Sequence, residues 1–244
     1  MQEGLSQHCV WVTGAGSGIG RAMALAFATA GARVALTGRH QDPLERVAAE
    51  ISQAGGLPAT VAAADVLDRQ GMVDVVETII SRTGRLDILC ANAGYNNPKR
   101  TWAALNWEEW DAVVDINIKG TIACVAAALA PMRRQRNGLI LMTASWAGRF
   151  HTPIAGVPYG ASKHAMVSLS ASLNAEEGVN GIRSTALCPG EVATPLLLKR
   201  PGFDPADSVK MIQPEDVAEA ALFVARMNPA VAIHEIAMAP ARTG

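Results

Sequence analysis

The sequence predicts an α/β fold, in which a doubly wound parallel sheet of about seven strands is flanked by helices. Short apolar runs rich in valine, leucine and isoleucine alternate with longer segments of helical periodicity along the chain. Half of the 244 residues are apolar and only 5% are aromatic, as expected where helices cover a buried sheet. No repeat, low-complexity tract or linker divides the chain, so we expect a single domain over residues 1–244.

The predicted elements follow one another in strict alternation. The apolar runs predict strands at Cys9–Thr13, Arg33–Thr37, Ala59–Ala63, Leu86–Ala91, Gly138–Thr143, Ile182–Cys188 and Ala232–Met238. The segments of helical pattern predict helices at about Ile19–Ala30, Pro43–Ala54, Arg69–Arg82, Trp107–Met132, Pro158–Gly178 and Pro214–Ala225. The region at about 196–213 contains proline and glycine and breaks the alternation, which predicts a lid formed by a mobile flap or a short helical insertion.

Charge and composition argue against several classes of protein. The net charge is −1 and no block of like charges occurs, so we expect no nucleic-acid surface. The five histidines show no paired spacing, so we expect no metal site. The four cysteines lie in apolar runs without a C-x-x-C motif, which is typical of buried free thiols in a reducing compartment. The first residues lack a signal peptide, and no uninterrupted apolar stretch can span a bilayer, so we expect a soluble cytoplasmic protein.

Tyr159 and Lys163 stand four residues apart in Y-G-A-S-K. This spacing places both side chains on one face of a helix. An ammonium beside a phenol favours the phenolate, so we expect Lys163 to lower the pKa of Tyr159 from about 10. The pair predicts a proton donor and acceptor that works near neutral pH. The alternative is a surface tyrosine that packs on a lysine stem.

A glycine-rich loop follows the first predicted strand, with the sequence T-G-A-G-S-G-I-G at Thr13–Gly20. The absence of β-carbons at a strand-to-helix turn lets a pyrophosphate approach the backbone and the helix N-terminus, which predicts a dinucleotide site. The alternative is a tight turn without a ligand. After the second strand, Gly38 leaves room and Arg39 offers a guanidinium to a 2′-phosphate, which favours NADP over NAD. Arg39 is otherwise a solvated turn residue.

With these features the chain resembles the short-chain dehydrogenase/reductase family over nearly its full length. Further matching motifs are A-D-V at Ala64–Val66, N-A-G at Asn92–Gly94, Asn117 in D-I-N-I-K-G, Ser145 in M-T-A-S-W and P-G-E-V-A-T at Pro189–Thr194. The resemblance implies a Rossmann fold and an NAD(P)-dependent oxidoreductase. NADP-preferring members often carry a basic residue in the glycine loop where this chain has Ser17, which departs from the NADP pattern. Each motif also has a structural reading as turn, capping or strand-end residues.

The resemblance carries two sets of site residues to this chain. The catalytic set is Asn117, Ser145, Tyr159 and Lys163. The cofactor-binding set is Gly14, Ser17, Gly18, Ile19, Gly20, Arg39, Asp65, Val66, Asn92, Ala93, Gly94, Tyr159, Lys163, Pro189, Gly190, Val192 and Thr194.

The implied reaction is hydride transfer between NADP(H) and a carbonyl or secondary alcohol. Tyr159 would exchange a proton with the substrate oxygen, and Ser145 would stabilise that oxygen. Lys163 would also hold the nicotinamide ribose, and Asn117 would anchor a water that links Lys163 to solvent. Alternatives are a catalytically inactive dinucleotide-binding regulator, or a lyase or epimerase, although relatives of the latter kind usually have a larger substrate domain.

The substrate pocket is expected between the loops that follow the strands. Candidate lining residues are Tyr95, Asn96, Asn97, Trp146, Arg149, Phe150, His151 and the lid from Leu196 to Met211. Arg149 is a candidate for binding a substrate carboxylate, although a surface or interface role is favoured. The three tryptophans Trp102, Trp107 and Trp110 are interpreted as helix-packing residues.

Two predicted helices, Trp107–Met132 and the one after Tyr159, are apolar around much of their circumference. One sheet face cannot cover both sides of such helices, and soluble proteins seldom leave large apolar patches exposed. We therefore expect these helices to pair across a two-fold axis in a homotetramer or a homodimer. The alternative is that the lid covers the second side within one subunit.

Overall fold

A computed structural model describes residues 4–197 and 202–241 of the chain. Within these residues, seven strands form one sheet with the order β3-β2-β1-β4-β5-β6-β7, and every adjacent pair is parallel. The strands are β1 (Cys9–Thr13), β2 (Arg33–Thr37), β3 (Thr60–Val61), β4 (Ile88–Ala91), β5 (Gly138–Thr143), β6 (Ile182–Pro189) and β7 (Glu235–Met238). The predicted parallel sheet of about seven strands is confirmed.

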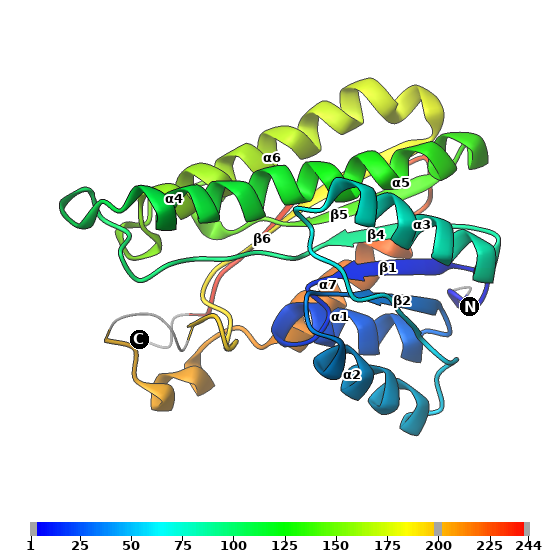
Figure 1. Cartoon of the computed structure of the whole chain (residues 1–244), viewed down its shortest axis with the longest axis horizontal. Helices are drawn as coiled ribbons and strands as arrows, with labels where there is room; N and C mark the ends of the chain where they lie inside the picture. The colour runs from blue at the N-terminus through cyan, green and yellow to red at the C-terminus, as the bar shows by residue number, and fades with distance from the viewer. Residues whose placement is uncertain (1–3, 198–201, 242–244) are drawn as a thin grey trace.

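Helices cover both faces of the sheet (Figure 1). One layer contains α1 (Gly18–Thr29), α2 (Gln41–Gln53) and α7 (Pro214–Ala225). The other contains α3 (Arg69–Thr83), α4 (Trp107–Val114), α5 (Thr121–Gln135) and α6 (Val157–Glu177). Alternate residues of a strand point to opposite faces. In β1, Val10 and Val12 accordingly belong to the core under α1, whereas Cys9 and Trp11 belong to the core under α3 and α5.

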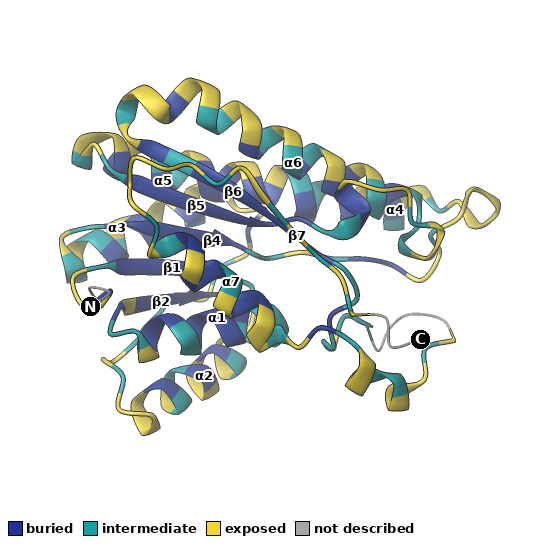
Figure 2. Ribbon diagram, turned by 180° about the vertical axis from the view of Figure 1, so that it is seen from behind, coloured by how far each residue is buried: buried dark blue, intermediate teal, exposed yellow. Residues whose placement is uncertain are grey.

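The strand order changes direction at β1, because β2 lies on one side of it and β4 on the other. In open α/β sheets a ligand binds beyond the carboxyl ends of the strands at such a switch point. The glycine-rich loop after β1 and the N-A-G segment after β4 therefore lie side by side at the carboxyl ends of the strands. Strand burial is nearly complete along β1, β4 and β5, so this edge is held by a rigid support (Figure 2).

Four strands differ from their predicted bounds: β3 is shorter than Ala59–Ala63, β6 ends one residue later, at Pro189, and β4 and β7 begin later. The hydrogen bonds explain the last two differences. β4 begins at Ile88 rather than Leu86, because the backbone N–H and carbonyl of Leu86 bond the side-chain amide of Gln135 at 2.9 and 2.8 Å. β7 begins at Glu235 rather than Ala232, because the carbonyl of Ile233 accepts the Thr185 hydroxyl at 2.6 Å instead of a ladder bond.

The long predicted helix Trp107–Met132 contains a wide turn. α4 and α5 are joined by the π-helical segment Asp115–Gly120, and α5 continues to Gln135. Of the described helices, Trp107–Gln135 alone is long and apolar enough to cross a membrane by those two criteria. Its charged pair Asp115–Lys119 (2.7 Å) interrupts the apolar run, and one side packs on the sheet as a core helix does.

The three tryptophans that were predicted to pack on helices differ in their burial. Trp110 is buried and its indole N–H donates to the carbonyl of Lys99 at 3.0 Å. Trp102 and Trp107 are 71% and 70% exposed. Trp102 nevertheless contacts a helix, because its ring centroid lies 5.2 Å from that of Trp110 on α4. Trp107 is the exposed first residue of α4.

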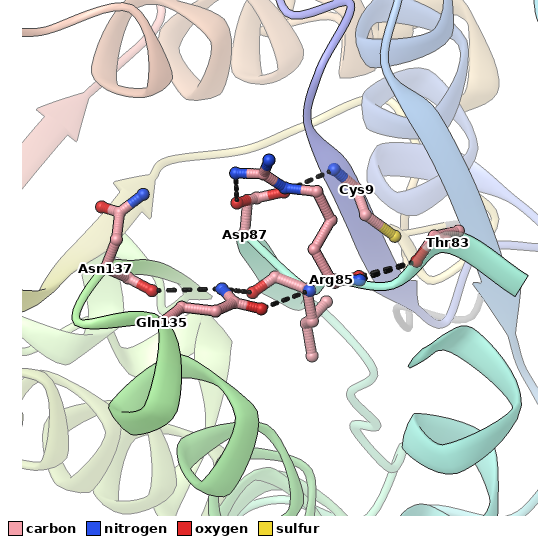
Figure 3. Close-up of polar contacts among 7 residues, drawn as sticks. Cys9, Thr83, Arg85, Asp87, Gln135 and Asn137 are labelled. Atoms are coloured by element: carbon pink, nitrogen blue, oxygen red, sulfur yellow. Dashed lines mark hydrogen bonds and ion pairs between the residues drawn. The ribbon is translucent and has the colours of Figure 1, made fainter. Parts of the chain in front are cut away.

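At the amino ends of the strands, the buried carboxylate of Asp87 links the start of β1 to the residues that precede β4 (Figure 3). Asp87 accepts the backbone N–H of Cys9 and both Nε and Nη2 of Arg85, all at 2.8 Å. The four cysteines are buried free thiols, as predicted. Burial raises the pKa of the Cys9 thiol to about 11, which makes it unreactive at neutral pH.

Candidate active site

A cavity of about 730 Å³ opens beyond the carboxyl ends of the strands. It is lined by the glycine loop, the turns after β2, β3, β4 and β6, the end of β5 and the first turns of α6. All residues of the predicted catalytic and cofactor-binding sets line it except Gly20 and Asn117. Motifs that are spread over more than half of the sequence therefore line one cavity.

The glycine loop forms a cradle from which side chains are excluded. Gly14 and Gly18 have φ values of 63° and 53°, in the left-handed region that favours glycine. A β-carbon on Gly18 would lie 3.2 Å from Cγ2 of Thr194, so this loop closely approaches the segment after β6. Gly20 packs beneath the cradle, because a β-carbon there would lie 2.3 Å from the carbonyl of Gly14. Gly20 does not line the cavity, and its part in binding a cofactor stays a prediction.

The cradle fits the pyrophosphate of a dinucleotide. α1 begins at Gly18, with Ser17 as its extended N-cap, so its first backbone N–H groups lack intrahelical partners. Beneath it, the side-chain amide of Asn92 donates to the carbonyl of Thr13 at 3.1 Å and accepts the Thr143 hydroxyl at 3.0 Å. Asn92 therefore fixes the spacing between β1, β4 and β5 at the cavity floor.

Basic side chains gather at the end of the cavity beside α2. Arg39, His40 and Arg46 all line it there, and all three are exposed. Arg39 was predicted from the sequence, whereas His40 and Arg46 were not. Arg46 lines the cavity because α2 carries it there. Asp65 also lines this end, and its carboxylate accepts the backbone N–H of Leu67 at 3.0 Å. That bond is the turn-residue role noted as an alternative for Asp65.

Tyr159, Lys163 and Ser145 lie together at the opposite end. Ser145 precedes the short 3₁₀ helix Trp146–Gly148, and its Oγ accepts the N–H of Ala147 at 3.1 Å. Burial raises the pKa of Tyr159, and a hydrogen bond with Ser145 partly opposes this rise. α6 approaches the short helix closely, because a β-carbon on Gly148 would lie 2.6 Å from the carbonyl of Lys163.

The expected lowering of the Tyr159 pKa by Lys163 is not observed. Lys163 is 3% exposed, and its Nζ donates to the carbonyl of Thr143 at 2.7 Å. It lies 5.4 Å from the centroid of the Tyr159 ring, so it faces the ring rather than the hydroxyl. Burial lowers the pKa of Lys163 itself to about 8. The burial of Lys163 also contradicts the alternative of a surface tyrosine on an exposed lysine stem.

Asn117 lies behind the lining, in the π-helical segment. Its side chain is fully buried, donates to the carbonyl of Tyr95 at 3.0 Å and to Oγ of Ser162 at 2.9 Å, and accepts the N–H of Tyr95 at 2.8 Å. A β-carbon on Gly94 would lie 3.4 Å from Asn117 Oδ1 and 3.6 Å from Lys163 Nζ. Asn117 and Lys163 therefore approach Gly94 from two helical segments, and of these three residues Asn117 alone does not line the cavity.

The substrate end of the cavity differs from the prediction in several residues. Tyr95, Asn96 and Trp146 line it as expected, whereas Asn97 is fully buried beneath it. Arg149, Phe150 and His151 do not line it. The side chain of Arg149 turns away and pairs with Glu235 at 2.8 Å. Residues that the sequence analysis missed are Arg100, Thr152, Ile154, Ala155 and Glu191.

The predicted lid is described in part. Leu196 and Leu197 line the cavity, and residues 198–201 lie outside the described residues. Pro205–Lys210 forms a 3₁₀ helix, which agrees with the alternative of a short helical insertion. The segment rejoins the fold at Ile212, which forms a bridge with Val192. In residues 4–197 and 202–241, no cluster of three or more His, Cys, Asp or Glu side chains is arranged to hold a metal ion.

Comparisons with known proteins agree with this geometry. Residues 8–201 match the family model described as short chain dehydrogenase. The chain is 33% identical over 236 residues to an uncharacterized oxidoreductase of Staphylococcus aureus (strain MW2), covering 97% of this chain and 98% of the relative.

Two solved structures show the same fold. A 3-ketoacyl-(acyl-carrier-protein) reductase from Brucella melitensis complexed with NADH is 31% identical, with a TM-score of 0.86 and 96% of both chains covered. An alcohol dehydrogenase from the archaeon Thermococcus sibiricus complexed with 5-hydroxy-NADP is 28% identical, with a TM-score of 0.86 and 96% of both chains covered. The two similar proteins thus hold different nicotinamide dinucleotides.

Proposed function

The chain belongs to the short-chain dehydrogenase family, and on that premise we propose that it transfers a hydride between NADP(H) and a carbonyl or secondary alcohol substrate. One observation carries the proposal. Ser145, Tyr159 and Lys163 converge at one end of a cavity that is also lined by a glycine cradle at a helix N-terminus. A dinucleotide whose pyrophosphate binds the glycine cradle would place its nicotinamide near the Tyr159 hydroxyl. That hydroxyl can exchange a proton with the substrate.

The residues at the α2 end support NADP rather than NAD. Arg39 and Arg46 supply two guanidinium groups beside Gly38, where an NAD-binding site more often has an acidic side chain. A 2′-phosphate pairs well with guanidinium groups. The similar structures contain either NADH or an NADP derivative, so the preference rests on the residues of this chain.

Bound NADPH supplies the hydride, and the residues of this chain manage the substrate oxygen and its proton. Because burial raises the pKa of Tyr159, its phenol is protonated at neutral pH and is suited to donate a proton to a carbonyl oxygen. Ser145, hydrogen-bonded to that phenol, is placed to stabilise the developing charge on the same oxygen. Lys163 is fixed by its hydrogen bond to the carbonyl of Thr143 at the end of β5. Asn117 orients the backbone at Tyr95 by accepting its N–H.

Three further features of the protein belong to the same proposal. We place the active protein in the cytoplasm, where four buried thiols remain reduced. We assign the segment at about 196–213 as the substrate lid, because Leu196 and Leu197 line the cavity. We expect a single domain that assembles as a homotetramer.

The direct test is an absorbance assay at 340 nm with NADPH and NADH over a panel of carbonyl compounds, and with the oxidised cofactors over the matching alcohols. We expect turnover of at least one substrate class with NADPH, and loss of that turnover in Tyr159→Phe. Binding of NADPH, followed by its fluorescence, should be the same in both proteins. Turnover that persists in the variant would refute the assignment of Tyr159.

A further inference from the structure

We propose that Trp146 forms an aromatic wall of the substrate site, so that the substrate class is ketones that carry an aromatic ring, together with the corresponding secondary alcohols. The inference rests on the proposed function, because that function places the substrate at the end of the cavity that holds Ser145 and Tyr159. It names a chemical class for the substrate, a residue that contacts it and a second residue, Phe150, that positions this contact.

Trp146 is the direct neighbour of the group that is proposed to stabilise the substrate oxygen. Ser145 is the N-cap of the 3₁₀ helix Trp146–Gly148, so Trp146 is the first residue of that helix. The side chain of Ser145 accepts the N–H of Ala147 at 3.1 Å, and its carbonyl accepts the N–H of Gly148 at 2.8 Å. These two bonds close a tight turn that fixes the backbone of Trp146 beside Ser145. A substrate whose oxygen contacts Ser145 and Tyr159 therefore has Trp146 next to its remaining atoms.

The indole of Trp146 is supported by the ring of Phe150. The two ring centroids lie 4.4 Å apart, with an interplanar angle of 35°. The backbone holds the pair together, because the carbonyl of Trp146 accepts the N–H groups of Arg149 and Phe150 at 3.0 and 2.9 Å. Trp146 lines the cavity, whereas Phe150 does not. Phe150 thus supports the indole from outside the cavity, and Trp146 presents aromatic surface to a ligand inside it.

The two aromatic side chains lie outside the core. Among the described residues, neither Trp146 nor Phe150 belongs to the apolar clusters on the two faces of the sheet. Phe150 is 48% exposed, and Trp146 is half-buried. By contrast, Trp11 is fully buried and its indole N–H donates to the Thr37 hydroxyl at 2.9 Å, as expected of a structural tryptophan. A large aromatic side chain outside the core that lines a cavity is typical of a ligand site.

Apolar side chains from two other segments line the same cavity. They come from the residues after Phe150 and from the start of the lid, and they are Ile154, Ala155, Leu196 and Leu197. Two polar side chains between these segments have partners within the protein. The Thr152 hydroxyl donates to the carbonyl of Phe150 at 3.2 Å, and the Asn96 amide donates to the carbonyl of Ala155 at 3.0 Å. An uncharged ring beside Trp146 therefore leaves these polar groups paired.

A flat ring gains more from this wall than a saturated ring of similar size. Aromatic pairs contribute about 2- to 10-fold in affinity beyond the apolar area that they bury. Since Phe150 already holds the indole, Trp146 loses little side-chain freedom when a second ring packs on it. A cyclohexyl group buries a similar area and has no aromatic face. Trp146 should therefore distinguish a phenyl ketone from its cyclohexyl counterpart.

The test compares ketones that differ only in the ring. Phenylacetone and 4-phenyl-2-butanone are each paired with their cyclohexyl counterpart, and kcat and KM are measured with NADPH. In these compounds the ring is not conjugated to the carbonyl, so the two members of a pair have similar reactivity. All of them are uncharged, so the comparison does not depend on Arg100 and Glu191, which also line the cavity. We expect the unaltered protein to have a lower KM for the phenyl member of at least one pair.

Substitutions of Trp146 separate aromatic character from apolar bulk. Trp146→Leu keeps an apolar side chain, and it should raise KM for the preferred phenyl ketone about 2- to 10-fold more than KM for its cyclohexyl counterpart. Trp146→Phe keeps an aromatic ring and should retain most of the preference. Trp107→Leu replaces an exposed tryptophan outside the cavity and should leave the ratio of the two KM values unchanged. An equal rise in both KM values in Trp146→Leu would overturn the proposal.

Substitutions of Phe150 test its positioning role. Phe150→Ala should raise KM for the phenyl ketone and leave kcat unchanged, because the indole loses its support while the reacting groups stay in place. Phe150→Leu restores an apolar support and should recover part of the affinity for the phenyl ketone. An equal fall of kcat for the phenyl and cyclohexyl ketones in Phe150→Ala would instead indicate a general structural role and contradict the positioning role.

A binding measurement separates this inference from the proposed function. 4-Phenyl-2-butanone is titrated by calorimetry into the protein loaded with NADP⁺, which cannot reduce it. Binding that Trp146→Leu weakens, in a protein that reduces no ketone with NADPH, would contradict the proposed function and support the aromatic wall. Turnover of ketones without any preference for the phenyl members would leave the proposed function standing and overturn the aromatic wall. Absence of both binding and turnover would overturn both.

Discussion

In the candidate active site, burial disfavours the charged forms of two neighbouring side chains, Tyr159 and Lys163. The pKa of the Tyr159 phenol is raised and the pKa of the Lys163 ammonium is lowered to about 8, because each is taken out of water. Tyr159 therefore keeps its proton at neutral pH, and Lys163 gives up its own more easily than a solvated lysine. This arrangement favours proton donation by Tyr159 and makes the ionisation of the pair sensitive to pH.

Replacing Tyr159 by phenylalanine should reduce kcat by about 100- to 10,000-fold, because it removes the transferred proton and little else. The affinity for NADPH and the midpoint of thermal unfolding should be close to those of the unaltered protein. Lys163→Ala, in contrast, should lower both kcat and cofactor affinity. Steady-state kinetics with a substrate from the 340 nm panel, combined with a fluorescence titration of NADPH, measures both effects.

Lys163 should give the free energy of unfolding a distinct pH dependence. Between the folded pKa of about 8 and the ordinary value of 10.5, the unfolded chain binds the proton and the folded protein does not, so rising pH favours folding. Below pH 8 the folded protein carries the full cost of a buried ammonium, roughly 3 kcal/mol. Lys163→Met removes this cost and should therefore be more stable near pH 7.

The measurement is urea unfolding of both proteins between pH 7 and 10. The stability advantage of Lys163→Met should shrink as the pH rises above 8. The cysteines of the unfolded chain also titrate in this range, but they are present in both proteins and cancel in the difference. A difference that stays constant across the range would mean that Lys163 titrates as a solvated lysine.

Cofactor preference should follow the two residues after β2. A β-carbon on Gly38 would meet only Leu44, at 3.4 Å or more, so aspartate fits there. Gly38→Asp with Arg39→Ala should shift binding from NADPH toward NADH by a few kcal/mol at most, because a carboxylate repels a 2′-phosphate and binds the ribose hydroxyls. Titration calorimetry gives both affinities, and Arg33→Ala, an exposed arginine at the other end of β2, is the control. Equal affinity of the unaltered protein for both cofactors would argue against Arg39.

At the scale of elements, the buried Asp87 joins two central strands far from the active site. Asp87→Asn should lower the free energy of unfolding by about 1–3 kcal/mol, because the Arg85 guanidinium loses its charged partner and a buried N–H donor group is introduced. Asp207→Asn is the matched control, since its pair with Lys210 (2.9 Å) is exposed and should contribute less than about 1 kcal/mol. Urea unfolding at pH 7 compares the two. An equal effect of both substitutions would contradict the assigned role of Asp87.

Periodicity located the strands and helices well, because each element has a clear apolar pattern. β1, β2, β5 and α7 begin and end where the sequence predicts. The pattern could not show the π-helical segment Asp115–Gly120, since its residues continue the helical spacing on both sides. Its wide turn depends on the bonds of buried Asn117 with Tyr95, which lie in another part of the fold.

Motifs located most of the residues that line the cavity, because these residues follow strands and meet at one edge of the sheet. Residues placed by loops were not predictable in this way. Arg100 is positioned by hydrogen bonds to carbonyls of two separate segments. Arg149 lies outside the cavity, where it pairs with Glu235 on the last strand. Gly20 carries the same motif as Gly14, and only the packing beneath the loop separates their roles.

At the scale of the whole molecule, α5 and α6 retain apolar surface away from the sheet. Ile122 on α5 is 45% exposed and Ala161 on α6 is exposed, whereas Leu169 and Leu173 are half-buried against the core. Figure 2 shows the exposed outer side of α6. We predict that these helices pair with their symmetry mates in a homotetramer. Light scattering at micromolar concentration should give a mass several times that of the 25.5 kDa chain.

Ile122→Glu should shift that mass toward smaller assemblies, because it places a charge in the predicted interface. Val209→Glu, on the 3₁₀ helix of the lid and 83% exposed, is the control and should not change the mass. A monomer at micromolar concentration would refute the assembly. A dimer would retain the interface and remove only the second axis.

The centre of the sheet is made from strands that leave the ribosome far apart in time. β1 pairs with β4, and the bond between Cys9 and Asp87 spans 78 residues of chain. At about 5–20 residues per second, the glycine loop exists for roughly 4–16 s before the opposite wall of its cradle has been synthesised. A nascent chain that stalls in this interval presents one exposed edge of β1, a strand otherwise buried on both faces. The candidate cofactor site is therefore completed only after β4 has been synthesised, long after its glycine loop.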